Sequence, residues 1–176
     1  IGTGFDAVSF LSKEPAEGIA ASALARLEDL DSLQPDEPWY LHVHFTDPHT
    51  PYIAPERYLK GLEGLEAIDY DLSAADEVAA LADAYDSMTS DEQALVRQDV
   101  AVQYRAEVAY LDDELATFWQ ALEQRGSLDR TLVLLISDHG EQFWEHGEFR
   151  HAKSLHPGEG DAVAAFWWNG IQSGHW

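Results

Sequence analysis

Histidine residues gather in two short windows of this chain, and their spacing indicates a site for an anion or a metal ion. The chain has eight histidines, and six of them lie in residues 42–49 or residues 139–151. In the second window Asp138 and His139 stand side by side before Gly140, so that a carboxylate and an imidazole can reach one divalent cation. The dipeptide alone is equally consistent with an aspartate that caps the following element and a histidine in a solvated turn.

A basic group follows this pair in a chain that is otherwise poor in positive charge. Arg150, His151 and Lys153 lie within four positions of one another. Such side chains hold a sulfate or phosphate through charge-assisted hydrogen bonds, and a histidine can protonate a leaving oxygen. In the first window His49 lies in a proline-stiffened loop, which suits catalysis or anion binding. Solvated loop histidines are the alternative interpretation, and His42 is best read as an ordinary strand histidine.

The composition limits the partners of such a site. The 176 residues carry 33 acidic side chains against 10 Lys and Arg, a formal charge of -23 that disfavours nucleic acid and anionic membranes. No apolar run reaches the roughly 18 to 20 residues of a membrane span. Without cysteine the chain has no disulfide, no thiolate ligand and no cysteine nucleophile.

The elements that must position these residues follow from hydrophobic spacing. Apolar residues recur at three-to-four spacing between Pro15 and Pro35, which predicts a helix. Residues 39–46 alternate between apolar and polar, which predicts a strand with histidines on one face. Residues 131–136 are apolar on both faces, as in a central parallel strand covered by helices. The order of these elements predicts an α/β fold.

A long helix is predicted between the two windows. Ser90 and Gln93 are spaced as a capping box, and Gly126 ends the pattern. The residues expected on its buried face are Val96, Val100, Tyr104, Val108, Leu111, Leu115, Phe118 and Leu122. Before this helix, residues 61–90 contain no basic side chain and are expected to form an acidic, exposed and mostly helical excursion.

Taken together, the windows resemble the sulfatase family, within the alkaline-phosphatase-like superfamily. The match runs from about residue 4 to residue 155. Its specific parts are WYLHVHFTDPHTPY at 39–52, YRAEVAYLD at 104–112, SDHGE at 137–141, EHG at 145–147 and HAKSL at 151–155. The resemblance implies that residues 1–155 form part of a catalytic domain, with a mostly parallel central sheet and helices on both faces.

The resemblance also implies a metal-dependent sulfuric-ester hydrolase. The metal ligands would be Asp138 and His139, and the ion is expected to be calcium, with manganese or zinc as alternatives. Sulfatases often carry Asn at the position of His139, which leaves the ion open. His49 would lie beside the sulfate. The basic residue after the metal loop would be His151, favoured by spacing, or Lys153.

The family's nucleophile is not among these residues. In sulfatases a formylglycine, made from Cys or Ser in a Cys/Ser-X-Pro/Ala-X-Arg motif, attacks sulfur. No such motif occurs here, so the chain by itself is expected to be inactive. Residues 156–176 depart from the family pattern and show no clear period, and we expect a truncation or a frameshift near Leu155.

Other functions stay open at this point. A phosphoester or phosphonate hydrolase of the same superfamily is one alternative, and a non-catalytic metal- or anion-binding domain is another. The expected substrate is a small-molecule or glycan sulfate ester. The oligomeric state and the compartment are open, although members of the family are often periplasmic or secreted.

Overall fold

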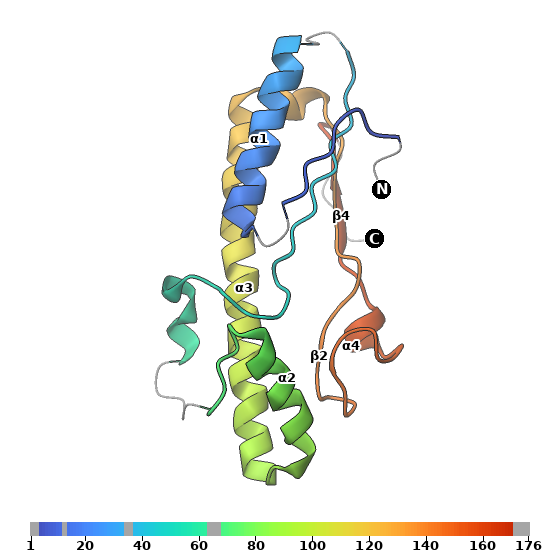
Figure 1. The fold of residues 1–176 in the computed structure, drawn as a ribbon. Helices are drawn as coiled ribbons and strands as arrows, with labels where there is room; N and C mark the ends of the chain where they lie inside the picture. Colours follow the sequence, from blue (N-terminus) through green and yellow to red (C-terminus); the bar gives the residue numbers. More distant parts are fainter. Residues whose placement is uncertain (1–3, 12–13, 34–36, 63–67, 171–176) are drawn as a thin grey trace.

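A long helix, α3, forms the axis of the molecule in the computed structural model, which describes residues 4–11, 14–33, 37–62 and 68–170 (Figure 1). The helices are α1 (Ala16–Leu33), α2 (Ala75–Ala84), α3 (Ser90–Gln124) and α4 (Pro157–Gly160), with 3-10 turns at Glu56–Leu62, Tyr85–Ser87 and Ser127–Arg130. The strands are β1 (Val133–Ile136), β2 (Gln142–Phe143), β3 (Phe149–Arg150) and β4 (Ala164–Trp167).

The beginning of α3 differs from the sequence prediction by one residue. Thr89 is the N-cap, and its hydroxyl accepts from the Glu92 backbone while the Glu92 carboxylate accepts from the Thr89 backbone N–H. The predicted box of Ser90 and Gln93 is therefore wrong. The Gln93 amide instead donates to the carbonyl of Tyr85, 3.0 Å away.

The carboxyl end of α3 is where the sequence places it. Gly126 has a φ of 68°, the left-handed conformation that a glycine adopts readily after a helix. Arg125, the C-cap residue, reaches back to α1 and lies 2.5 Å from Asp31 and 3.7 Å from Glu28. The predicted helix between the two prolines is confirmed as α1, with Leu27 only 1% exposed against Leu122 of α3.

Residues 39–46 alternate as predicted but do not form a strand. Trp39, Leu41, Val43 and Phe45 are half-buried, and the residues between them are exposed. Trp39 and Leu41 pack into the cluster that joins α1 to α3. A strand requires a hydrogen-bonded neighbour, and within the part of the chain that the structure describes no strand pairs with this segment.

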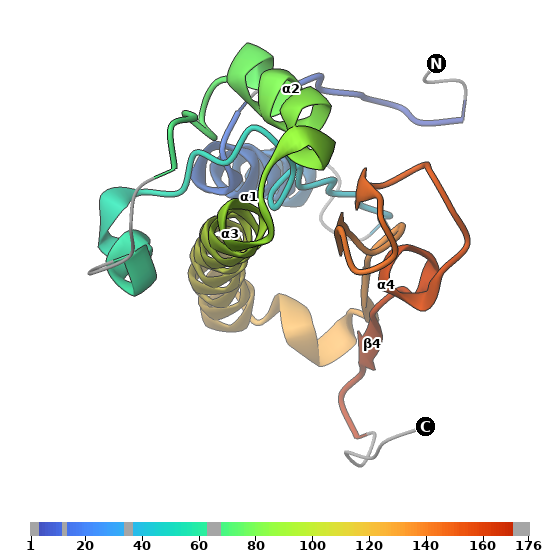
Figure 2. The same ribbon diagram turned by 90° about the horizontal axis from the view of Figure 1, so that it is seen from below.

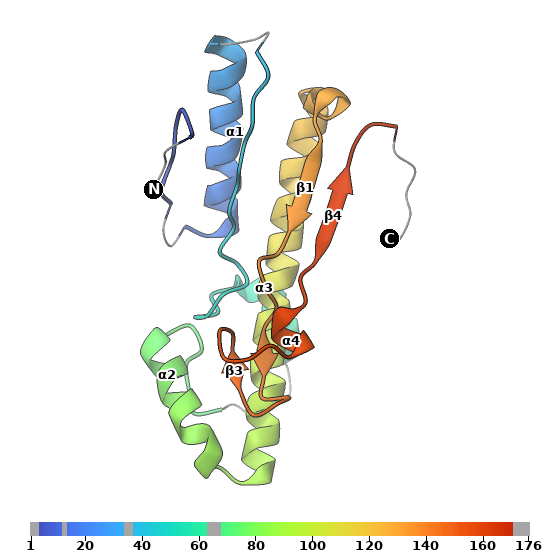
Figure 3. The same ribbon diagram turned by 90° about the vertical axis from the view of Figure 1, so that its right-hand side faces the viewer.

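The strand predicted at residues 131–136 is present as β1, but its surroundings differ from the prediction. β1 pairs antiparallel with β4, in the register Val133 to Trp167. The helices α1 and α3 lie on one side of this pair of strands (Figures 2 and 3). Leu134 and Ile136 are 66% and 68% exposed, so among the described residues β1 is not covered on both faces. The described strands form two antiparallel pairs and no parallel sheet.

A second core lies around the amino-terminal half of α3. Leu72, Val78, Leu81 and Tyr85 from the acidic segment are buried there together with Val100. A stack of aromatic rings connects this core to the β2–β3 hairpin: Trp144 lies 4.0 Å from Tyr85 and 4.1 Å from Phe149, centroid to centroid. The acidic segment is thus helical in α2, yet it contributes apolar side chains to the core.

Some predicted features lie outside the described residues. These are Pro35, Glu63, Glu66 and the last six residues of the chain. The segment that showed no period in the sequence contains α4 and β4. No helix that the structure describes is both long enough and apolar enough to cross a membrane.

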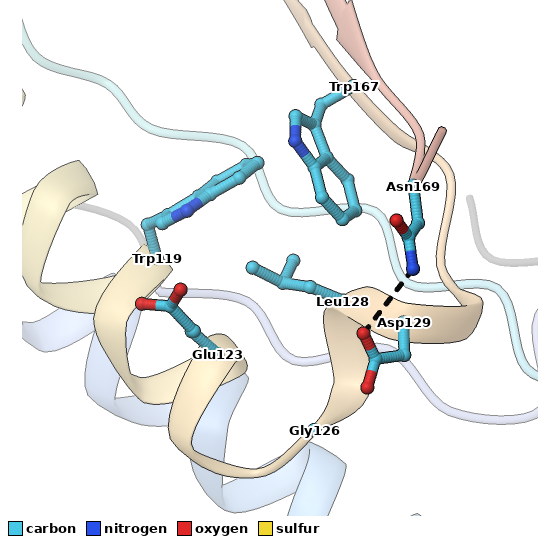
Figure 4. Close-up of a pocket in the computed structure, with 7 residues that line it drawn as sticks. All are labelled: Trp119, Glu123, Gly126, Leu128, Asp129, Trp167 and Asn169. Carbon is cyan, nitrogen blue, oxygen red and sulfur yellow. Dashed lines mark hydrogen bonds between the residues drawn. The ribbon is translucent and has the colours of Figure 1, made fainter. Parts of the chain in front are cut away.

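A pocket of about 190 Å³ lies at the carboxyl end of α3. Trp119 and Trp167 meet there edge to face, with ring centroids 5.3 Å apart, and Asp129 accepts from Asn169 at 3.4 Å (Figure 4). None of the histidines that the structure describes lines this pocket.

Candidate functional site

Three histidines from the two sequence windows come together in the structure. The ring of His151 lies 4.0 Å from that of His139 and 5.2 Å from that of His49, measured between centroids. His49 comes from the loop after residues 39–46, His139 from the turn after β1, and His151 from the segment after β3. The fold thus joins segments about a hundred residues apart into one imidazole cluster.

The geometry of Asp138 and His139 fits a shared cation. The Nδ1 atom of His139 lies 2.7 Å from the carbonyl oxygen of Gly140, so Nδ1 carries the proton and Nε2 keeps its lone pair. That Nε2 atom lies 3.7 Å from Oδ1 of Asp138. Two atoms at this separation can both bind one ion with ligand distances of about 2.0 to 2.5 Å.

These two residues alone would not make a complete metal site. Within the described ranges, no three His, Asp or Glu side chains converge as a metal cage. Calcium takes six to eight oxygen ligands, roughly, and zinc about four ligands in all. The donor set of Asp138 and His139 therefore fits a metal whose other ligands come from outside these residues.

Glu141 orients His151. Its Oε1 atom lies 3.0 Å from Nδ1 of His151, and its side chain is only 5% exposed. Burial raises the pKa of Glu141, while the hydrogen bond and charge of His151 act to lower it. The contact occupies Nδ1 and leaves Nε2 of His151 for a ligand. His49 is oriented in the same way, since its Nδ1 lies 2.5 Å from the carbonyl oxygen of Thr50.

A buried carboxyl pair lies beneath the His49 loop. Glu107 of α3 is 2% exposed and accepts a hydrogen bond from the backbone N–H of Ile53. Burial, and then the hydrogen bond and charge of Asp47, raise its pKa to about 7. The hydroxyl of Tyr52 is buried beside them, and burial together with the charge of Glu141 raises its pKa.

A second buried carboxylate, Glu159, holds the segment that follows His151. Its oxygens accept from the backbone N–H of Lys153 at 2.7 Å, from the Ser154 hydroxyl at 3.0 Å and from the Gln142 amide at 2.7 Å. Burial acts to raise the pKa of Glu159, but these hydrogen bonds outweigh it and lower the pKa to about 2. Its carbonyl oxygen also accepts from the N–H of Gly140.

The remaining candidates lie around this centre. Lys153 is exposed, and its backbone is anchored by Glu159. Arg150 is half-buried, and its charge lowers the pKa of Tyr52. His42 is exposed, and its ring lies nearly parallel to that of His44 with centroids 6.5 Å apart, outside the three-histidine cluster.

Sequence reasoning missed Glu107, Glu141 and Glu159. The structure buries Glu107 where the predicted apolar face had Val108, which is 42% exposed. A signal was present, because Glu107 lies three positions after Tyr104 and seven after Val100, at helical spacing on the same face. Glu159 lies in a segment without periodicity, and only its tertiary contacts distinguish it.

The mixed α/β arrangement of the described residues matches part of the alkaline-phosphatase-like fold seen in solved sulfatase structures. Over 93% of its length the chain superposes on 33% of the proposed sulfatase yidJ from Bacteroides fragilis, with a TM-score of 0.67 and 20% identity. It superposes on 42% of BT4656, solved with its substrate D-glucosamine-2-N,6-O-disulfate, with a TM-score of 0.61 and 18% identity.

The family follows from the sequence comparisons. The sulfatase family model matches residues 13–174, and the choline-sulfatase of Rhizobium meliloti is 30% identical over 140 residues. The chain belongs to the sulfatase family. The aligned region is 73% of this chain but 27% of that choline-sulfatase, so the chain spans well under half the length of such relatives.

Proposed function

We propose that this chain is the carboxyl-terminal part of a metal-dependent sulfatase and that it supplies the anion-binding and acid–base half of the active site. The observation that carries the proposal is the convergence of His49, His139 and His151, from three separate segments, with ring centroids 4.0 and 5.2 Å apart. If these histidines were only solvated loop residues, we would not expect their rings to form one cluster in which two imidazoles are held by hydrogen bonds.

The residues of this chain would divide the work as follows. His49 would hold a sulfate oxygen through Nε2, because its Nδ1 is occupied by the Thr50 carbonyl. His151, held by Glu141, would give a proton from Nε2 to the leaving alcohol oxygen. Lys153 would add positive charge at the entrance, against the net charge of -23.

Asp138 and His139 would hold a divalent ion, calcium by resemblance to the family, together with ligands from the rest of the protein. Such an ion stabilises negative charge on a transferring sulfate group. The formylglycine nucleophile would come from a segment outside this sequence, and the chain alone would therefore not turn over an ester. In the whole protein we expect β1 to join a mostly parallel sheet.

The proposed substrate is a small-molecule or glycan sulfate ester. The choline-sulfatase relative and the disulfated glucosamine bound by BT4656 support this class. His139 supports a second candidate, a phosphoester or phosphonate hydrolase, because many sulfatases have Asn at that position. A third candidate is a binding domain without catalysis.

The test compares kcat/KM of the full-length protein for 4-nitrophenyl sulfate and 4-nitrophenyl phosphate after calcium loading. Preference for the sulfate supports the proposal, and preference for the phosphate supports the second candidate. Calcium titration of the chain alone tests the third, because a pair of ligands predicts weak binding whereas a self-sufficient binding domain predicts tight binding.

A further inference from the structure

A buried oxygen near His49 has no donor to bind. Oδ2 of Asp47 is inaccessible to solvent, and no hydrogen-bond donor of the described residues reaches it when all carboxyl groups are ionised. The side chain of Asp47 interacts with the carboxyl of Glu107, which is itself 2% exposed. Two ionised carboxylates held close together in a buried place repel each other, and a buried acceptor without a donor destabilises the fold.

One proton resolves both problems. If Glu107 carries it, its O–H donates to the Asp47 carboxylate, and the orphaned oxygen gains a partner. The other oxygen of Glu107 still accepts from the backbone N–H of Ile53. Glu107 would then bind the loop at both ends, at Asp47 before His49 and at Ile53 after it.

We propose that Asp47 and Glu107 share one proton and that this pair is a positioning element that holds His49 in the site. Among the described residues no hydrogen bond joins Glu107 to His49, His139 or His151, so we assign its effect to the loop. This proposal rests on the proposed function only where it is tested by enzyme activity.

The surroundings of the pair favour the shared proton. Burial and the charge of Asp47 both raise the pKa of Glu107, and the backbone N–H groups of the loop oppose them only in part. Arg150 lies close enough to lower the pKa of Tyr52, but Glu141 lies there too and raises it. The titratable and charged groups that face the pair and its neighbour Tyr52 are Tyr52, Tyr104, Tyr110, Glu141 and Arg150.

The test uses the full-length enzyme and three variants: Glu107→Gln, Glu107→Ala and the control Glu123→Gln. Gln mimics the protonated acid, because its amide donates to Asp47 while its oxygen accepts from Ile53. We expect Glu107→Gln to keep kcat within about threefold of the wild type at pH 6, and Glu107→Ala to lower it at least about tenfold. Glu123 is exposed on the same helix and should behave as wild type.

The pH profile separates positioning from mere packing. The wild type should lose activity at alkaline pH as the shared proton leaves, whereas Glu107→Gln should lack that loss. An alkaline limb that is unchanged in Glu107→Gln, or full activity of Glu107→Ala, overturns the proposal.

A readout independent of activity keeps the two proposals distinguishable. The midpoint of urea unfolding should fall as the pH rises from about 5 to 8 in the wild type, and this fall should be smaller in Glu107→Gln. If the wild type hydrolyses no sulfate ester, the proposed function fails, and this profile decides the pair by itself. Equal slopes in both proteins then overturn the shared proton.

Discussion

The Nδ1 atom of His151 lies 3.0 Å from Oε1 of Glu141, and this contact determines which nitrogen of the histidine is available. The carboxylate is almost fully buried, so it fixes the ring rather than following it. Nε2 of His151 is left for a ligand, beside the rings of His139 and His49. Because the ring of His151 is oriented in this way, we expect the loss of His151 to affect catalysis.

His49→Ala and His151→Ala should each lower the turnover of the full-length enzyme at least about tenfold, because each removes a positioned anion or proton contact. Steady-state kinetics with a sulfate ester measures this. Lys153→Ala, assayed in parallel, shows whether Lys153 or His151 is the more important basic residue. His42→Ala is the matched control, and it should leave kcat unchanged. Wild-type kinetics in both His49→Ala and His151→Ala would remove these residues from the site.

Gly140→Ala should disrupt the loop that we propose binds a metal, because a Cβ atom at this position would clash with the backbone carbonyl oxygen of Gly158 and lie 3.2 Å from that of Asp161. We expect at least about a tenfold loss of activity, and weaker calcium binding, since the loop bears Asp138 and His139. Gly158→Ala is the control, with its nearest neighbour at an ordinary 3.6 Å. If the two variants have the same activity and calcium affinity, the loop can move enough to accommodate the added Cβ atom.

Glu159→Gln should weaken the fold at neutral pH and reduce its sensitivity to acid. The pKa of Glu159 is lowered to about 2, below the ordinary value of 4.5, so its ionised form contributes stability above about pH 4.5. That contribution is lost as the pH falls towards 2. Urea unfolding at several pH values should show a flatter acid limb in Glu159→Gln than in the wild type. Glu148→Gln, an exposed control in the same region, should retain the wild-type profile.

Thr89→Ala should destabilise the protein by about 0.5 to 2 kcal/mol, because it removes the side-chain half of the capping box of α3. Ser90→Ala, one position later and inside the helix, should change the unfolding free energy by less than about 0.5 kcal/mol. Chemical denaturation of both variants measures the difference. A larger effect of Ser90→Ala would restore the cap predicted from the sequence.

The helices and the histidine windows could be predicted from the sequence because they depend on local patterns. The periodicity between Pro15 and Pro35 yields α1, and Gly126 ends α3, since both signals act within a few residues. The structure then brings His49 of the first window to His151 of the second, with ring centroids 5.2 Å apart. Convergence of these windows follows from the family resemblance and from the topology.

The remaining features depend on contacts between distant residues, which local patterns do not contain. Residues 39–46 have the alternation of a strand, but a strand also needs a neighbour. The buried face of α3 includes Glu107 instead of Val108, because Asp47 and Ile53 provide partners for a carboxyl group. Glu159 shows no periodic signal, and its role comes from hydrogen bonds with Gln142, 17 positions away, and with Lys153 and Ser154.

The hydrogen bond between Ile53 and Glu107 also has a consequence for the order in which the chain folds. The two residues are 54 positions apart. A ribosome adds about 5 to 20 residues per second, so Glu107 is synthesised roughly 3 to 11 s after Ile53. The histidine cluster also needs His151, which is synthesised later than Glu107. During that interval the helix α1 can form from local contacts, whereas the three-histidine cluster cannot form until residue 151 has been synthesised.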